Sequence, residues 1–286
     1  MLEFPQFLNI PLAELVDAGM SWILTNLGSV FDAIGTSILA LLLVIERIFL
    51  WIPWIVTILA VGIIAWRALR HWWAGVLFAA MLVLIGSFGL WDLAMMTLAI
   101  IFASVIISLV VGIPTGILMA RSNIFQSVLK PLLDAMQTMP SFVYLIPALM
   151  LFGLGKVPAV FATIIYAIPP VIRLTNIGIR QVPKSVIEAA QAFGSTSRQI
   201  LYEVQIPLAI PSIMVGINQT TMMALAMVVI ASMIGAKGLG MQVLLAINRI
   251  EIGKGFEAGI CIVFLAIIID RITHAMAARK EYSVSS

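Results

Sequence analysis

Long runs of apolar residues, separated by short polar or charged stretches, dominate this chain. A helix that crosses a bilayer needs about 20 mostly apolar residues, because its backbone groups must be satisfied within the segment itself. The pattern therefore predicts an all-α, polytopic membrane protein with about seven transmembrane helices. The expected spans lie near 48–66, 72–91, 94–119, 137–155, 158–176, 212–234 and 256–277.

Prolines interrupt two of these spans. The fourth and fifth contain Pro140, Pro147, Pro158, Pro169 and Pro170. Proline removes a backbone donor and kinks a helix, so these two spans are predicted to be kinked and packed closely on their neighbours. A broken or re-entrant path for these segments stays open.

The first 47 residues contain a shorter apolar stretch. Thr36 to Ile45 is only ten residues long, less than a span requires. It is interpreted as an interfacial helix lying along the outer membrane surface. The alternative is an eighth span, which would place the N-terminus inside.

Composition supports a membrane protein and excludes several other classes. Of 286 residues, 62% are hydrophobic and 10% are charged, and the mean hydropathy is +1.15, whereas soluble domains carry about 25% charged residues. One cysteine and two histidines form no spacing typical of disulfides, zinc or redox centres. The basic residues are scattered between apolar runs, so no nucleic-acid surface is predicted.

The basic residues also predict an orientation, because cytoplasmic loops are enriched in Lys and Arg. If 177–211 is cytoplasmic, eleven basic residues lie inside and five lie outside. This orientation places the C-terminus in the cytoplasm and the N-terminus outside. The inside set is Arg67, Arg70, Arg121, Lys130, Arg173, Arg180, Lys184, Arg198, Arg271, Arg279 and Lys280, and the outside set is Arg47, Lys156, Lys237, Arg249 and Lys254.

The polar stretch 182–211 is the longest between spans, and its pattern predicts two short helices. The first begins at Pro183, carries one apolar face made of Val186, Ile187, Ala190 and Phe193, and ends at Gly194. Thr196 followed by Gln199 is typical of a capping box that opens the second helix. Pro207 is expected to end that helix. A connector packed on its own membrane domain is the alternative interpretation.

The same stretch resembles the EAA signature of ABC importer permeases. The resemblance consists of Glu188-Ala189-Ala190, then Gly194, then Val204-Gln205-Ile206-Pro207. It implies that the loop is a coupling helix that docks into a groove of a cytosolic ATPase, and that spans from 94 to 277 form the five-helix core of a type I importer. The residues assigned to coupling are Glu188, Ala189, Ala190, Gly194, Arg198 and Pro207.

This resemblance also predicts partners. The chain contains no GxxxxGK[ST] phosphate loop, so ATP and Mg are expected on a separate ATPase subunit, with no cofactor in this chain. A permease with one coupling loop implies a second copy of itself and two ATPase subunits. A binding protein outside the bacterial or archaeal cytoplasmic (inner) membrane would deliver the solute. The chain itself is expected to be no enzyme.

Further stretches resemble the permeases for glycine betaine, proline betaine, carnitine and choline. They include 134–145, 168–173, 235–240 and 255–259. The resemblance implies ATP-driven uptake of an osmoprotectant, with the selective site on the binding protein. Polar and methionine residues are candidates for the translocation path, although interhelical hydrogen bonding and packing are the alternative roles. The candidates are Gln137, Tyr144, Asn218, Gln219 and Met222.

The predicted organisation has four parts: an N-terminal segment 1–47, two accessory spans in 48–91, a permease core 92–279 with the coupling loop 177–211, and a cytoplasmic tail 280–286. An ion-coupled secondary transporter of small polar solutes is the alternative function. That class predicts mid-membrane carboxylates and internal repeats, and neither is evident. An intramembrane enzyme would require a nucleophile–base pair, which the sequence does not suggest.

Overall fold

The structure is a computed structural model that describes the backbone of residues 11–284 and the side chains of residues 11–275. This part of the chain is helical and contains no strand, which confirms the all-α class. Its α-helices are α1 Leu12–Trp51, α2 Trp54–Leu69, α3 Trp72–Ser87, α4 Trp91–Arg121, α5 Asn123–Thr138, α6 Leu145–Phe152, α7 Lys156–Arg180, α8 Lys184–Ala192, α9 Ser197–Gln199, α10 Ile206–Ala231, α11 Leu239–Arg249 and α12 Ile252–Val284.

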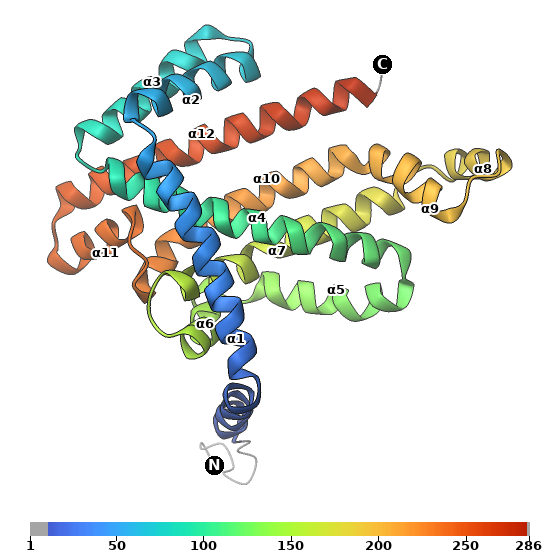
Figure 1. Cartoon of the computed structure of the whole chain (residues 1–286), viewed down its shortest axis with the longest axis horizontal. Coiled ribbons are helices and arrows are strands. Elements are labelled where there is room, and N and C mark those ends of the chain that lie inside the picture. Colours follow the sequence, from blue (N-terminus) through green and yellow to red (C-terminus); the bar gives the residue numbers. More distant parts are fainter. Residues whose placement is uncertain (1–10, 285–286) are drawn as a thin grey trace, which may run out of the picture.

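Within residues 11–284 there are also three short helices of other types: the 3-10 helices η2 (Ser141–Tyr144) and η4 (Ser232–Ile234), and the π-helix η3 (Ile200–Gln205). Figure 1 shows α4, α7, α10 and α12 running alongside one another, while α1 crosses this bundle. The helices α8 and α9 project from one end of the bundle, and α11 lies at the other. The two ends are therefore built differently.

Small residues bring α7 close to its neighbours on two sides. On α4, Ser104, Ser108, Gly112 and Gly116 recur at every fourth position and are buried. A Cβ added to Gly116 would lie 2.7 Å from the carbonyl oxygen of Ile172 on α7. Small residues at such spacing let helix backbones approach closely in a membrane. On the opposite side, Gly216 of α10 approaches α7 in the same way.

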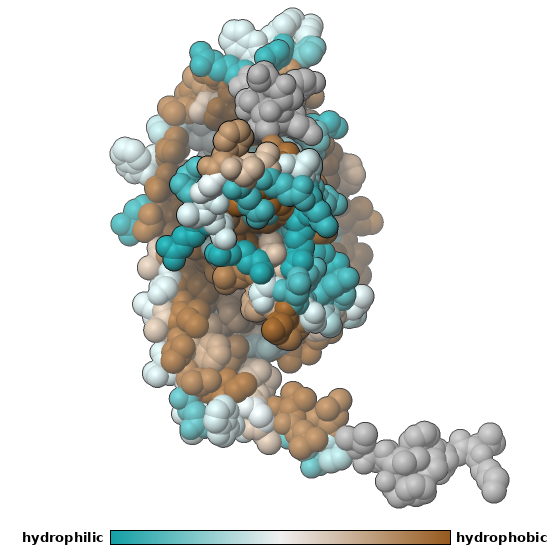
Figure 2. All heavy atoms as spheres, turned by 90° about the vertical axis from the view of Figure 1, so that its right-hand side faces the viewer, coloured by the Kyte–Doolittle hydropathy of each residue, from teal (hydrophilic) through white to brown (hydrophobic). Residues whose placement is uncertain are grey.

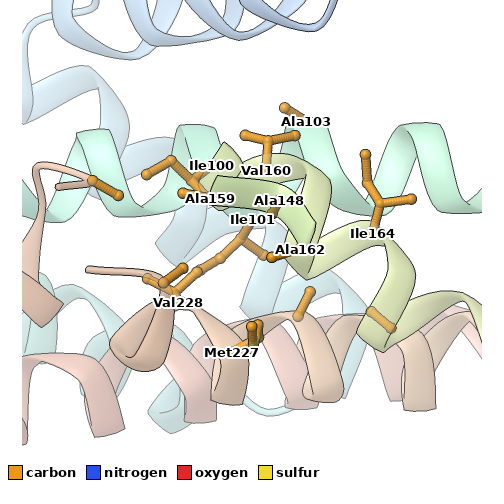
Figure 3. Packing of buried hydrophobic residues seen from close by; sticks show 14 of the residues in the cluster. Ile100, Ile101, Ala103, Ala148, Ala159, Val160, Ala162, Ile164, Met227 and Val228 are labelled. Carbon is orange, nitrogen blue, oxygen red and sulfur yellow. The ribbon is translucent and has the colours of Figure 1, made fainter. Parts of the chain in front are cut away.

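The largest buried cluster joins α4, α6, α7 and α10 (Figure 3). Ile101 of α4, Ala162 of α7 and Met227 of α10 are all at most 1% exposed. Figure 3 shows these side chains pointing toward one another between the ribbons. Met227 is thus a packing residue, in agreement with the alternative role given to the methionines.

The seven predicted spans correspond to α2, α3, α4, the α5–α6 pair, α7, α10 and α12. Of these, α4, α7, α10 and α12 are long and apolar enough to cross a membrane, whereas α2 and α3 are shorter apolar helices of 16 residues each. The predicted limits 48–66 and 72–91 were therefore too wide, because 48–51 end α1 and Trp91 begins α4. The apolar runs continue across these helix boundaries, so hydropathy alone could not locate them.

The N-terminal helix is much longer than expected. The prediction of a short helix over 36–45 is wrong, because α1 runs unbroken for 40 residues. This helix is itself apolar enough to be a candidate span. Acidic residues such as Asp32 do not end it, since a side chain on one face of a helix leaves its backbone hydrogen bonds intact. Its interfacial position stays a prediction. The first ten residues of the predicted N-terminal segment 1–47 lie outside the described residues.

A partly buried ion pair joins α1 to the bundle. Glu46 is on the narrow stripe of α1 that is buried, together with Gly35, Ile38 and Leu42. Its carboxylate accepts two hydrogen bonds from the Lys156 ammonium at the start of α7, at 2.7 and 2.6 Å. Both residues were predicted to lie toward the outer side, and the pair joins segments 110 residues apart in the sequence.

The fourth predicted span is broken, as the open alternative allowed. The helices α5 and η2–α6 meet at an angle of 112° across Met139 and Pro140. The helix α5 starts at Asn123, well before the predicted start at 137, because its polar residues lowered the apolar signal. In contrast, α7 continues through Pro169 and Pro170, which are both buried. Prolines therefore interrupt one of these two segments and not the other.

Candidate coupling loop and translocation face

The predicted helix-turn-helix is present between α7 and α10. The helix α8 begins after Pro183 and is followed by Gly194, whose φ of +82° lies in the left-handed region that favours glycine. The Thr196 hydroxyl accepts a hydrogen bond from the Gln199 N–H, and the Gln199 side chain accepts one from the Thr196 N–H, which completes the capping box. These local signals placed both turns correctly.

The helix α8 is mostly exposed. None of its residues is buried; Glu188 and Ala189 are exposed and Ala190 is half-buried. Phe193, which was assigned to the apolar face of this helix, is 92% exposed at the tip of the loop. Among the residues whose side chains the structure describes, none covers Phe193. Figure 2 faces this end and shows hydrophilic residues gathered at its centre, with hydrophobic residues around them.

The second helix of the loop does not end at Pro207. The short α9 passes through the π-helix η3 directly into α10, and Pro207 lies in the first turn of α10. Proline is tolerated in a first helical turn, and the i→i+5 pattern before it already interrupts the regular ladder. The loop is therefore continuous with the membrane helix α10. Arg198, in α9, is exposed.

A cavity of about 260 Å³ separates the loop from the bundle. Loop residues on one side face the ends of α4 and α7 on the other, including Arg180. The Arg180 guanidinium donates three hydrogen bonds: to Asn176 of its own helix at 3.0 Å, to Asn123 of α5 at 2.8 Å and to the Met119 carbonyl of α4 at 3.0 Å. These hydrogen bonds thus connect the end of α7 to the α4–α5 turn, next to the coupling loop.

The path candidates on α10 separate into two groups. Gln219 and Met222 are exposed, and they share one face of the helix with the exposed Val215 and Ala226, at spacings of three and four residues. Asn218 is instead half-buried and donates to the Asp270 carboxylate of α12 at 3.4 Å. The structure brings Gln219 and Met222 together and places Asn218 between two helices.

The other two candidates lie on either side of the bend between α5 and α6. Gln137 is exposed in the last turn of α5. Tyr144 is buried, its hydroxyl donates to the Met136 carbonyl, and its ring packs edge-on against Tyr166. Tyr144 therefore holds the bend in shape, whereas Gln137 is open to a ligand.

Two arginines of α7 bond to α5, and neither was singled out from the sequence. Arg180 bonds to Asn123, and Arg173 forms an ion pair with Asp134 at 2.5 Å. Both arginines were counted as cytoplasmic basic residues, and Arg173 and Asp134 also lie in stretches that carry the family resemblance, but no contact between them was predicted. The two arginines are seven residues apart, so they lie on one face of the helix. This spacing is the one sequence signal that could have suggested that both contact the same neighbouring helix. The side chains of Arg279 and Lys280 lie outside the described residues.

Comparisons with a family model, with known relatives and with solved structures all point to transport permeases. Residues 112–282 match the model of a family described as the binding-protein-dependent transport system inner membrane component. The glycine betaine/proline betaine transport system permease protein ProW of Escherichia coli (strain K12) is 46% identical over 93% of this chain and 75% of its own length. The glycine betaine transport system permease protein OpuAB of Bacillus subtilis (strain 168) is 45% identical over 96% of both chains.

A third relative is the glycine betaine/carnitine transport permease protein GbuB of Listeria monocytogenes serotype 1/2a (strain 10403S), which is 47% identical over 97% of this chain and 99% of its own. Among solved structures, the MetNI methionine ABC transporter in an inward-facing conformation has a similar fold, with a TM-score of 0.59 and 21% identity over 67% of this chain and 95% of that chain. Since the family match covers more than half of the chain, this protein belongs to the family of inner membrane components of binding-protein-dependent transport systems.

Proposed function

We propose that this chain is the membrane-spanning subunit of an ATP-driven importer of quaternary ammonium solutes, such as glycine betaine, proline betaine, choline or carnitine. The observation that carries the coupling part is α8, a helix with no buried residue that projects beyond the bundle (Figure 1). An uncovered helix whose small residues permit close approach suits docking into a groove of another subunit. That subunit is a cytosolic ATPase, which holds ATP and Mg.

The coupling residues take different roles in this proposal. Ala189 and Ala190 allow close approach, and Gly194 permits the left-handed turn that orients α8. Glu188 and Arg198 offer charged contacts at the rim, where charge complementarity guides association. Pro207 lies where η3 passes into α10, so movement of the loop reaches a membrane helix directly. Two copies of this chain would each engage one ATPase subunit.

The substrate class is supported by the relatives and by the chemistry of the exposed face. Three relatives more than 40% identical are named for glycine betaine, proline betaine or carnitine transport. Gln219 and Met222 offer a weakly polar surface on α10, with Gln137 at the bend of α5. Such a surface suits a solute that must cross the membrane without binding tightly on the way. Tight, selective binding through aromatic cation–π contacts belongs to a binding protein outside the membrane.

The orientation completes the proposal. The end that carries α8 faces the cytoplasm, and the opposite end, with α11, meets the binding protein. The C-terminus is then cytoplasmic and the N-terminus is outside, in a bacterial or archaeal inner membrane. Solute import follows from alternating access, in which closure of the ATPase subunits moves the coupling loops.

Reconstitution tests this function. The chain is purified with its ATPase and binding protein, placed in proteoliposomes, and assayed for ATP-dependent uptake of labelled glycine betaine, choline and carnitine. We expect uptake of at least one of these solutes by the wild-type complex. The double variant Glu188→Ala with Gly194→Val should abolish this uptake, although the wild-type and variant chains both still insert in the membrane. Uptake that depends on an ion gradient and continues without ATPase would overturn the proposal in favour of a secondary transporter.

A further inference from the structure

The helix α5 has few buried contacts for its length. Of its 16 residues only Leu133 is buried. Leu129 and Met136 are partly buried and pack against the same cluster. Yet α5 leads into the 112° bend beside Gln137, so its position determines where one candidate path residue lies. Polar bonds from another helix must therefore contribute to holding it.

Arg180 supplies one of these attachments, at the start of α5. Its Nη1 donates to Asn123 Oδ1 at 2.8 Å, while Nη2 donates to the carbonyl of Met119 in the last turn of α4 at 3.0 Å. Carbonyls in the last turn of a helix lack intrahelical partners and carry partial negative charge, so a guanidinium satisfies them well. One planar side chain thus joins three helices.

Arg173 supplies the second attachment, toward the other end of α5. Its Nη2 contacts Asp134 Oδ1 at 2.5 Å, with side chains that are 30% and 50% exposed. The Arg173 Nε is buried and has no partner among the described residues. Asp134 is therefore the acceptor that the structure describes for this guanidinium. Arg173 and Arg180 lie seven residues apart on one face of α7 and bond to α5 near both of its ends.

The same helix leads into the coupling loop. Arg180 is the last residue of α7, and α8 begins at Lys184. Arg180 also lines the cavity beneath the loop, with Gln191, Leu201 and Gln205 on the other side. A displacement of α8 is therefore applied to the end of α7 that carries these bonds.

We propose that Arg173 and Arg180 are positioning residues that make α5 move together with α7, so that movement of the coupling loop reaches the bend at Gln137. This inference rests on the proposed function and adds a transmission route to it. A helix attached at one end would pivot, whereas one attached near both ends follows its neighbour as a rigid unit. The guanidinium geometry is essential, because a lysine ammonium cannot bond to Asn123 and Met119 in the same planar arrangement.

The first test measures coupling rather than stability. Arg180→Lys, Asn123→Ala and Asp134→Asn are introduced singly and in combination, and the full complex is assayed in proteoliposomes for ATP hydrolysed per glycine betaine taken up. Combining Arg180→Lys with Asp134→Asn is expected to raise this ratio at least tenfold while ATPase binding stays at the wild-type level. Lys130→Gln, which removes a positive charge from the exposed side of α5, is the control and should leave the ratio unchanged.

The second test measures the movement of α5. Spin labels at Ser127 on α5 and Gln181 after α7, both exposed, report the distance between these helices. The wild-type complex should give one narrow distribution with and without ATP, and the combined variant a broad or shifted one. A narrow distribution and a wild-type ratio in that variant would overturn the inference. Because the wild-type complex is assayed in parallel, failure of uptake itself would count against the proposed function instead.

Discussion

At the scale of single residues, the absence of a side chain is as important here as its presence. Gly116 faces a backbone carbonyl on α7, which cannot rotate away as a side chain could. Gly259, on α12, has no atom within 4 Å of the position of its missing Cβ, apart from its chain neighbours and the adjacent backbone of its own helix. The two glycines differ in surroundings although both lie inside long apolar helices.

Gly116→Ala is therefore expected to destabilise the protein by about 1–3 kcal/mol, the usual cost of overpacking. Gly259→Ala is the matched control, and it should be neutral or slightly stabilising because alanine favours helix by up to about 1 kcal/mol. Thermal unfolding in detergent measures both. Equal unfolding temperatures for the two variants would show that α4 and α7 are not in such close contact.

Phe193 is the residue whose exposure is hardest to explain within one chain. A phenylalanine that is 92% exposed at the tip of α8 suits an anchor for the ATPase groove. Phe193→Ala is expected to weaken ATPase binding to the purified chain at least tenfold. Phe256→Ala, 70% exposed near the start of α12, serves as the control. If both variants bind the ATPase equally well, Phe193 is no anchor.

At the scale of whole elements, α1 is attached to the bundle by a narrow buried stripe that includes Ile38 and Leu42, and by one ion pair. Its apolar surface is mostly exposed, and Glu46 and Lys156 are 11% and 24% exposed. Removing one partner of a mostly buried pair leaves the other charge without compensation. The pair therefore helps to fix the position of α1 against the start of α7.

Glu46→Gln is expected to lower the stability of the protein by about 1–3 kcal/mol, because Lys156 loses its counter-charge. The double variant Glu46→Leu with Lys156→Met should recover much of this loss, since apolar residues can replace such a pair. Unfolding in detergent, followed by tryptophan fluorescence, compares the three proteins. A Glu46→Gln protein as stable as the wild type would contradict this role.

These elements also show what the sequence could predict. The fold class and the limits of α8 followed from apolar run length and from local turn chemistry at Gly194 and Thr196, because both depend on neighbouring residues. The length of α1 and the start of α5 could not be predicted in this way, because polar residues within these helices weakened the apolar signal. The partners of Glu46 and Arg173 were also missed, because they lie 110 and 39 residues away and only the packing of helices brings them together.

At the scale of the whole molecule, the two ends of the bundle imply an assembly larger than one chain. One end carries a single projecting α8, and α10 presents an exposed stripe with Gln219 and Met222. In the proposed function this stripe lines the translocation path, and such a path needs walls on all sides, of which the stripe of one copy would form only a part. A second copy related by two-fold symmetry would supply the remaining wall and the second coupling helix.

This arrangement predicts how a mixed complex behaves. The wild-type chain and a double variant, Phe193→Ala with Glu188→Ala, carry different affinity tags and are co-expressed with the ATPase and binding protein. Purification on the two tags in turn then selects complexes that contain one wild-type chain and one variant chain. Such complexes should form readily, because the variant residues lie at the exposed end of the loop. Their transport rate should fall well below half of the wild-type rate, since two ATPase subunits that close together must pull both loops at once. Failure to recover complexes carrying both tags would exclude a second copy, and a rate of one half would mean that the two coupling helices act independently.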